Sequence, residues 1–320
     1  MPETLAASGA EVEASEAEST TTVVIAFIAN LLIAISKSVV AAVTGSASML
    51  AESAHSWADT GNQVLLLVAD RRARRPADPQ HPYGYGREAY VWSMLAALGL
   101  FTAGAVVSVW NGVSALFHEH TEASYTWAWV VLGIAFVFEG ASFLQALRQT
   151  RREARHLDLD VFEHALNTSD PTLRAVFAED SAALTVIVVA ALGIGLSQLT
   201  GSPVFDAVGS IAVGLLLGVV AIVLINQNRR YLTGMESNER LRNAAVDKVK
   251  SMPQVDKVTY LRLEYVGPRQ VLLMTRVDFA GDEPEPDVAR SLRKLEKALE
   301  EDPNITEAVI TLSTPDEPGL

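Results

Sequence analysis

The sequence of 320 residues contains no cysteine. It can therefore form neither a disulfide bond nor a thiolate metal site, so any metal must be bound by nitrogen and oxygen atoms. Charged residues are scarce as well, at 20%, whereas 49% of the residues are hydrophobic, which is too apolar for most soluble domains of this length. A net charge of −13 offers no basic face for nucleic acid.

Basic residues are absent from residues 1–20, which include five Glu. No basic segment precedes an early apolar core, as it does in a secretory signal, and the Arg-rich composition of a mitochondrial transit peptide is missing too. We therefore expect residues 1–20 to be a disordered acidic tail, and the protein to lie in a prokaryotic cell membrane.

Apolar residues gather in six runs, each of which reaches the roughly 20 residues that a helix needs to cross a bilayer. The runs cover 22–44, 47–69, 91–117, 125–147, 176–199 and 204–226. Charged and apolar residues are mixed after residue 231, which indicates a soluble domain. The sequence thus predicts an all-α bundle of six transmembrane helices over 21–231 and a cytoplasmic domain over 232–315.

Arginines mark one side of the predicted membrane. They cluster after the second, fourth and sixth runs, whereas the three other loops (45–46, 118–124 and 200–203) contain no Lys or Arg. Because positively charged loops stay in the cytoplasm, we expect the ends of the even-numbered helices and both chain termini to be cytoplasmic.

The second apolar run carries a polar stripe, which we define as Glu52, His55, Asp59 and Asn62. Their spacing of three, four and three residues places all four on one face of a helix. An imidazole and a carboxylate on one face can share a divalent cation, Zn²⁺ above all. The alternative is that His55 and Asp59 pair with each other or with a neighbouring helix.

Further carboxylates lie in the other runs. Asp180 lies in the fifth run and could face the polar stripe, and a cation held between two helices is sensitive to their relative tilt, as alternating access requires. Metal and protons would compete for such ligands, which suffices for metal–proton exchange. Glu139 and Asp206, like Glu52, are better candidates for ion pairing or a proton path.

Two segments carry a resemblance to a known family. Residues 45–60 (GSASMLAESAHSWADT) and 78–87 (DPQHPYGYGR) resemble the cation diffusion facilitator family of zinc and manganese exporters. Residues 169–183 and 201–210 resemble the branch that contains the animal mitochondrial zinc transporter. The resemblance extends from about residue 22 to residue 310.

This resemblance implies a homodimer of six-helix units in membrane lipid, each with a cytoplasmic metallochaperone-like domain. It implies metal–proton antiport through a tetrahedral site on the second and fifth helices, which maps to His55, Asp59 and Asp180. Val176 replaces the family's usual fourth ligand, a His. Glu179 is a substitute for it, although neighbouring helical positions point about 100° apart; Glu52 or a water are others.

The resemblance leaves the metal open. Zn²⁺ comes first because an imidazole is present, and a carboxylate-rich set would also suit Mn²⁺ or Fe²⁺. Asp78 and His81 are candidates for an accessory metal site, but Tyr85 stands where the family often has a second His. The missing ligand at Val176 also allows a non-transporting, regulatory relative. An enzyme is not expected, since the sequence contains neither HExxH nor GxSxG.

The soluble domain is predicted to have the order α-β-β-α-β. Helices are expected over 238–251 and 286–301, and strands over 255–266, 270–279 and 305–313. This order fits a small ferredoxin-like α+β domain, whose expected role is dimerisation.

Overall fold

A computed structural model describes residues 27–28, 30–117, 126–156, 160–161, 165, 168–281, 284–314 and 316–320. The predicted acidic tail lies outside these residues. The chain divides into two compact units, and the division cuts across the long helices. The first unit holds the described residues up to Leu65 with Ala96–Val161 and Ala175–Val223, and the second holds Leu66–Leu95, Phe162–Arg174 and Leu224–Leu320.

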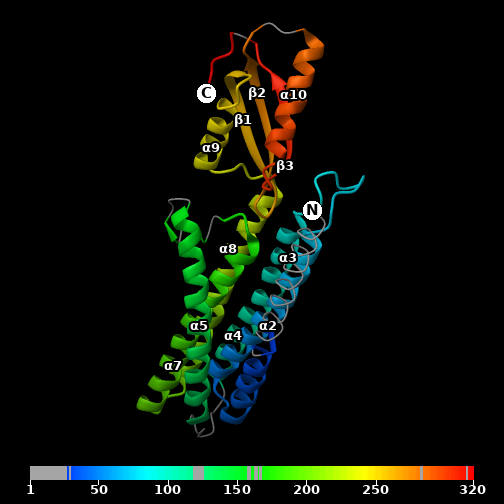
Figure 1. Cartoon of the computed structure of the whole chain (residues 1–320). Helices are drawn as coiled ribbons and strands as arrows, with labels where there is room; N and C mark the ends of the chain where they lie inside the picture. The colour runs from blue at the N-terminus through cyan, green and yellow to red at the C-terminus, as the bar shows by residue number, and fades with distance from the viewer. Residues whose placement is uncertain are drawn as a thin grey trace, which may run out of the picture. The chain divides into compact units, whose positions relative to one another are not determined.

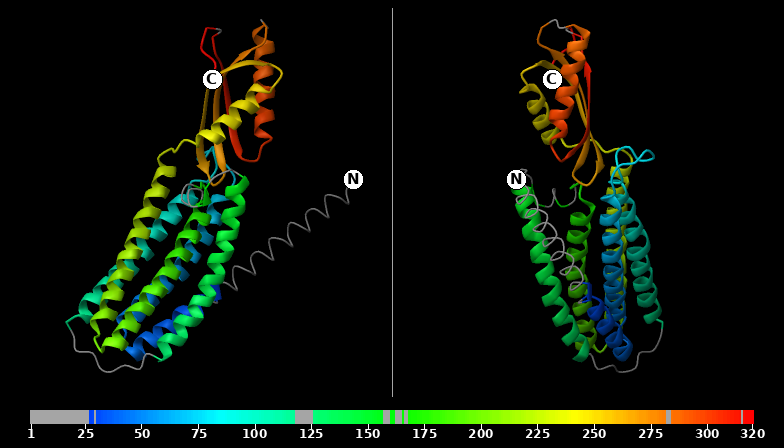
Figure 2. Two further views of the ribbon diagram at one scale, coloured as in Figure 1. Left: turned by 90° about the vertical axis from the view of Figure 1, so that its left-hand side faces the viewer. Right: turned by 45° about the vertical axis from the view of Figure 1, so that its right-hand side comes forward.

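Long helices run side by side as a bundle in the first unit, and parts of several of them belong to the second (Figures 1 and 2). A helix over Asn30–Thr44 comes first. It is followed by α2 (Ala47–Ala73), α3 (Glu88–Ala96), a π-helical turn (Ala97–Phe101), α4 (Thr102–Ala115), α5 (Thr126–His156), α7 (Pro171–Thr200) and α8 (Val204–Leu232).

Four helical segments of the described chain are long and apolar enough to cross a membrane: Glu88–Ala115, Thr126–Arg152, Pro171–Thr200 and Val204–Leu232. Their 27 to 30 residues correspond to roughly 40 Å or more, which exceeds the thickness of the hydrocarbon core. Large apolar side chains on them face outward, among them Val137, 68% exposed, and Leu199, 85% exposed. These helices make the protein a multi-pass membrane protein.

The first two predicted spans differ from these four. The described part of the first helix, Asn30–Thr44, is apolar but short. Helix α2 has 27 residues, yet the polar stripe lowers its hydrophobicity. Six membrane crossings therefore remain a prediction, and so does the boundary at residue 231.

The start of α2 is fixed by a carboxylate of α8. Asp206 accepts hydrogen bonds from Ser46 Oγ at 2.8 Å, the Ala47 amide at 2.7 Å and the Ser48 amide at 3.2 Å. A negative charge at this position also interacts favourably with the helix dipole. The Ser48 hydroxyl in turn donates to the Asp206 carbonyl oxygen at 2.7 Å. These bonds fix the start of the helix that carries the polar stripe.

The C-terminal part of the second unit contains α9 (Glu239–Lys250), β1 (Val255–Gly267), β2 (Gln270–Phe279), α10 (Glu285–Glu300) and β3 (Ile305–Leu312) (Figure 1). The predicted order of elements is therefore confirmed. Strand β2 is central, antiparallel to β1 and parallel to β3. Val249 of α9 and Leu299 of α10 join Leu263 and Leu273 of the sheet in one core. The ferredoxin-like fold itself remains a prediction for this three-stranded sheet.

The β1–β2 hairpin contacts helix ends within the second unit. Arg87 and Glu264 form an ion pair at 2.8 Å. The Tyr231 ring meets the Tyr265 ring edge-on, with 5.4 Å between the ring centroids. A Cβ atom on Gly86 would lie only 2.7 Å from Gly267 Cα, so this backbone approach requires glycine.

A buried arginine ties the start of α7 to the end of α8. Arg174 is 1% exposed and donates to the Thr168 carbonyl oxygen at 2.7 Å and to Asn228 Oδ1 at 2.5 Å. Its guanidinium also lies 5.2 Å from the centroid of the Tyr231 ring. The charge is thus held by hydrogen bonds and an aromatic face.

Candidate metal centre

Helix α2 buries the whole polar stripe, whose four residues are between 0% and 6% exposed. His55 and Asp59 lie one turn apart, with 3.3 Å between Nδ1 and Oδ1. Neither ring nitrogen of His55 has a hydrogen-bond partner among the described residues, and the same holds for Asp59 Oδ1. Buried polar atoms without partners are rare and costly, and a cation bound here would satisfy them.

Helix α7 contributes two carboxylates that point to different neighbours. Glu179 accepts a short hydrogen bond from the Asn62 amide, so it faces α2. Asp180 instead accepts a hydrogen bond of 2.9 Å from Ser142 of α5. The two directions follow from the rotation of about 100° between neighbouring helical residues.

Glu179 and Asp180 both line a cavity of about 320 Å³, which we call the carboxylate cavity. Asp59 of α2, Glu139 of α5, and Glu179 and Asp180 of α7 all line it. Asn30, Gln63, Phe138, Ala141, Ser142, Gln145 and Val176 complete its wall. Four carboxylates from three helices therefore meet around one space, with Val176 beside them.

In this conformation the predicted ligands do not form a closed metal site. No group of three or more His, Asp and Glu side chains in the described part of the chain is arranged to hold a metal ion. His55 does not line the cavity, and Asp180 is bonded to Ser142. The ligand set of His55, Asp59, Asp180 and Glu179 therefore stays a prediction.

The three residues considered for pairing or a proton path have different surroundings. Glu52 forms an ion pair with Lys37 at 2.6 Å, and Asp206 receives the hydrogen bonds at the start of α2. Glu139 lines the cavity and is partly exposed. By position, Glu139 is the member of this group that proton transfer through the cavity could use.

Sequence reasoning missed the polar residues of α5 that accompany Glu139. Ser142 and Gln145 follow it at intervals of three residues and line the same cavity. Their spacing places them near one face of the helix, and it is the signal that could have found them. Helix α5 thus supplies a wall of the cavity as well as a bond to Asp180.

At the candidate accessory site, the Asp78 carboxylate already accepts hydrogen bonds from neighbouring residues of its own loop. Asp78 accepts from the Tyr85 hydroxyl at 2.6 Å and from the amides of Gln80 and His81 at 2.9 and 2.8 Å. The Tyr85 bond is the main reason that the pKa of Asp78 falls to about 2. The His81 ring packs on Tyr85, with 4.1 Å between centroids. Asp78 and His81 therefore lie together, and their metal role remains a prediction.

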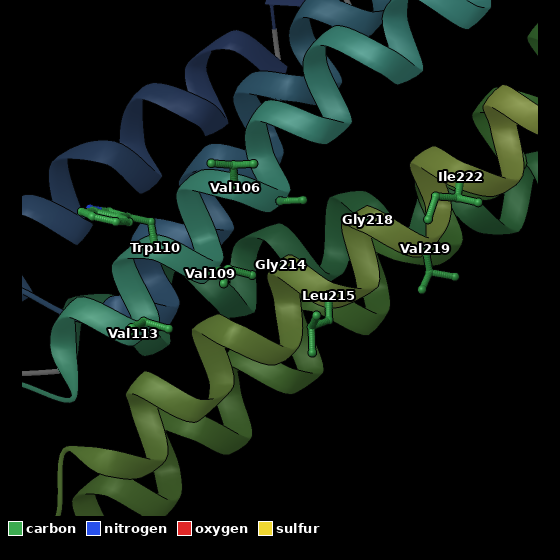
Figure 3. A pocket seen from close by; sticks show the side chains of 10 residues that line it. Val106, Val109, Trp110, Val113, Gly214, Leu215, Gly218, Val219 and Ile222 are labelled. Carbon is green, nitrogen blue, oxygen red and sulfur yellow. The ribbon is translucent and has the colours of Figure 1, made fainter.

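A second cavity, of about 540 Å³, lies between α4 and α8 (Figure 3). None of its lining residues is charged: Ala105, Val106, Val109, Trp110, Val113, Gly214, Leu215, Gly218, Val219 and Ile222. It offers a metal ion no suitable ligands. The cavity beside the polar stripe is therefore the candidate for metal passage.

Comparison with known proteins identifies the family. The family described as "cation efflux transmembrane domain" matches residues 23–233. The chain belongs to the cation diffusion facilitator family. The match includes α2, α5 and α7, which line the carboxylate cavity, so the candidate centre lies within the family's transmembrane domain.

Relatives within the cation diffusion facilitator family support the predicted branch. The chain is 36% identical over 238 residues to the mitochondrial proton-coupled zinc antiporter SLC30A9 of Xenopus laevis, and 34% identical to the human protein of that name. It is 35% identical over 233 residues to metal tolerance protein C4 of Arabidopsis thaliana. These alignments cover 73–74% of this chain but only 42–51% of the relatives. The chain thus spans about half or less of their length.

The names of the family and of these relatives are those of metal-cation transporters. The SLC30A9 relatives are named as antiporters, not as enzymes. The expectation of a transporter in the SLC30A9 branch is therefore confirmed, whereas the particular metal is not established.

Proposed function

We propose that the protein exports a divalent metal ion, Zn²⁺ foremost, in exchange for protons, by alternating access. The carboxylate cavity beside the buried His55 is the observation that carries this proposal. The names of the SLC30A9 relatives support the coupling of zinc to protons. In this account the metal is cargo, so the site must bind it and then release it.

The proposed ligands are His55 and Asp59 of α2 with Asp180 of α7, and Glu179 as the fourth. Glu179 already contacts the polar stripe through Asn62. Asp180 must leave Ser142 and turn towards α2 through a local change in α7, since a rotation of the whole helix by about 100° would turn Glu179 away. A site formed only when two helices adopt the correct relative position opens when that position changes.

Proton coupling follows from the chemistry of these ligands. Histidine and carboxylates bind a metal only after losing their protons, so protons that enter the cavity compete with the metal for the same atoms. Glu139 lines the same space and could pass protons to it. High proton activity on one side thus favours metal release on that side.

We further propose six membrane crossings with both termini in the cytoplasm, because the arginines cluster after every even-numbered apolar run. The small C-terminal sheet with α9 and α10 is then cytoplasmic, and we propose that it forms the homodimer contact. The prokaryotic cell membrane remains our proposal for the location.

Mn²⁺ or Fe²⁺ is the second candidate cargo. Four carboxylates line the cavity, whereas the one imidazole of the predicted site does not. Carboxylate-rich sites suit these harder cations better than they suit Zn²⁺. A comparison of fluxes for the three metals therefore decides the cargo.

The test is metal flux into proteoliposomes that contain a metal-sensitive dye, driven by an imposed pH gradient. We expect flux in the native protein and its loss in Asp59→Ala. Asp70→Ala is the matched control, because Asp70 lies on the same helix but only pairs with Arg74 on the surface. Flux that survives in Asp59→Ala contradicts the proposed site, and absence of flux for every metal in the native protein favours a regulatory relative.

A further inference from the structure

A buried ion pair links the helix over Asn30–Thr44 to α2 beside the candidate site. Lys37 Nζ lies 2.6 Å from Glu52 Oε1 and donates a hydrogen bond of 2.6 Å to Ser56 Oγ. The two charged side chains are only 1% and 0% exposed. Removing two charges from water is costly, and apolar packing of equal volume is often at least as stable, so this pair calls for a functional explanation.

Glu52 lies on the same face of α2 as the candidate metal ligands. It precedes His55 by three residues and Asp59 by seven, which correspond to about one and two helical turns. Its Oε2 atom has no hydrogen-bond partner within the described chain. By position, this carboxylate could therefore complete the metal site that Val176 leaves one ligand short.

We propose that Lys37 keeps Glu52 out of the metal's coordination sphere and thereby sets the affinity and selectivity of the site. This inference rests on the proposed transport function. The ammonium group neutralises the carboxylate at contact distance, and its positive charge repels a divalent cation that approaches Glu52. The metal is then held by His55, Asp59 and the carboxylates of α7 without a further acidic ligand.

Loss of the Lys37 charge would change the preference for metals in a defined direction. A released Glu52 adds a carboxylate oxygen, which is a harder ligand than imidazole. Mn²⁺ should therefore gain more affinity than Zn²⁺. In the native protein, the pair restrains the binding of hard cations and keeps the affinity low enough for the cargo to leave.

The experiment measures binding of ZnCl₂ and MnCl₂ to the purified full chain by competition with a fluorescent chelator. For Lys37→Met we expect Mn²⁺ binding to tighten by roughly tenfold or more, with a smaller gain for Zn²⁺. For Glu52→Gln and for the double variant Lys37→Met/Glu52→Gln we expect affinities within about threefold of native, since no ligand is lost.

Ser38→Ala is the matched control and should keep native affinity. Ser38 Oγ lies 2.7 Å from Ser53 Oγ, so this contact joins the same two helices without a charge. If Glu52→Gln weakens the binding of either metal about tenfold or more, Glu52 is a native ligand and the proposal is wrong. That result decides the question even if Lys37→Met does not fold, because Glu52→Gln keeps a hydrogen-bonding side chain at the pair.

Asp59→Ala in the same assay separates this inference from the proposed function. Native affinity in Asp59→Ala would refute the metal site and, with it, the role of Lys37. Loss of binding in Asp59→Ala together with unchanged Mn²⁺ affinity in a folded Lys37→Met would refute the role of Lys37 alone.

Discussion

Replacement of Asp206 by alanine should lower the stability of the bundle more than the loss of an ordinary helix cap does. The carboxylate is 3% exposed and accepts hydrogen bonds from Ser46, Ala47 and Ser48 at the start of α2. An Asp206→Ala variant leaves these donors buried without acceptors. It also removes the side-chain bonds that join α8 to the helix that carries the polar stripe.

The expected magnitude follows from these three bonds. A hydrogen bond to a charged group contributes about 1.5–3 kcal/mol, and the sum is reduced by the cost of burying the carboxylate itself. We therefore expect Asp206→Ala to lower the free energy of unfolding by about 3 kcal/mol. Asp206→Asn keeps an acceptor oxygen and should cost about half as much.

The assay is equilibrium unfolding of the purified protein in detergent, followed by tryptophan fluorescence. Asp170→Ala provides the comparison, because Asp170 accepts from the Thr172 and Leu173 amides of its own helix, α7. This ordinary cap should contribute about 1 kcal/mol. A loss below about 0.5 kcal/mol for Asp206→Ala would refute the reasoning, since three buried bonds cannot cost so little.

The same variants test the alternative role of Asp206 in a proton path. Asn cannot carry a proton as a carboxylate does. Proton-driven metal flux should therefore persist in Asp206→Asn if the residue only fixes α2. Loss of flux in a variant of near-native stability would instead assign Asp206 to proton transfer.

Three other variants probe packing, the candidate centre and the Asp78 loop. Gly214→Ala should destabilise the bundle by about 1–3 kcal/mol in detergent unfolding, because the new Cβ would lie 2.6 Å from a Val109 methyl group. Ser142→Ala should tighten Zn²⁺ binding about fivefold in chelator competition, because Asp180 no longer gives up a hydrogen bond worth about 1 kcal/mol. Tyr85→Phe should raise the pKa of Asp78 from about 2 towards its usual value, as measured by ¹³C carboxyl shifts.

Each of these three expectations has a result that would contradict it. Gly133→Ala is the control for packing, since a Cβ there meets nothing within 4 Å, and equal losses for both glycines would argue against close packing at Gly214. Weaker Zn²⁺ binding in Ser142→Ala would indicate that the hydroxyl helps to hold the ion. An unchanged Asp78 pKa would refute the importance of the Tyr85 bond.

The direction of the Asp78 pKa shift determines the pH range over which its hydrogen bonds stabilise the loop. The folded loop lowers the pKa of this carboxyl, so its hydrogen bonds stabilise the loop above the ordinary pKa of about 4 and are lost as the pH falls towards 2. In Tyr85→Phe the loss should be smaller and should be complete at a higher pH, because the folded pKa lies closer to the unfolded one.

Local signals predict the elements of the C-terminal sheet well. Predicted strands 255–266 and 270–279 agree with β1 and β2 to within one residue. Alternating apolar residues define each strand, and the turn after Gly267 and Pro268 is completed by Arg269 at a φ of 59°. Such patterns depend on neighbouring residues alone, so a single sequence contains them.

The start of α7 has a local sequence signal, although the pattern of apolar residues does not include it. The predicted span began at residue 176, whereas the helix begins at Pro171. Asp170 caps it through the Thr172 and Leu173 amides, and proline is favoured at the first helical position. The missed turn includes the buried Arg174.

The polar stripe and the carboxylates of α7 differ in how far sequence can predict them. The spacing along α2 alone places His55 beside Asp59, as observed. The partner of Asp180 depends instead on the rotation of α7 relative to α5 and α2, which no spacing within one helix determines. Sequence can therefore name this residue but not its partner.

The two carboxylates of α7 bond to different helices, and this affects the proposed transport cycle. Glu179 bonds to α2 while Asp180 bonds to Ser142 of α5, so a metal held by both helices requires Asp180 to change partners. One hydrogen bond of ordinary strength, about 1 kcal/mol, opposes that change, which corresponds to about a fivefold factor in affinity. In the proposed cycle, metal binding and the release of Asp180 from Ser142 are then thermodynamically linked: a conformation that keeps Asp180 on Ser142 binds the ion weakly, and one that frees Asp180 binds it tightly. We infer that the arrangement around Ser142 belongs to a low-affinity state, from which a bound ion would be released.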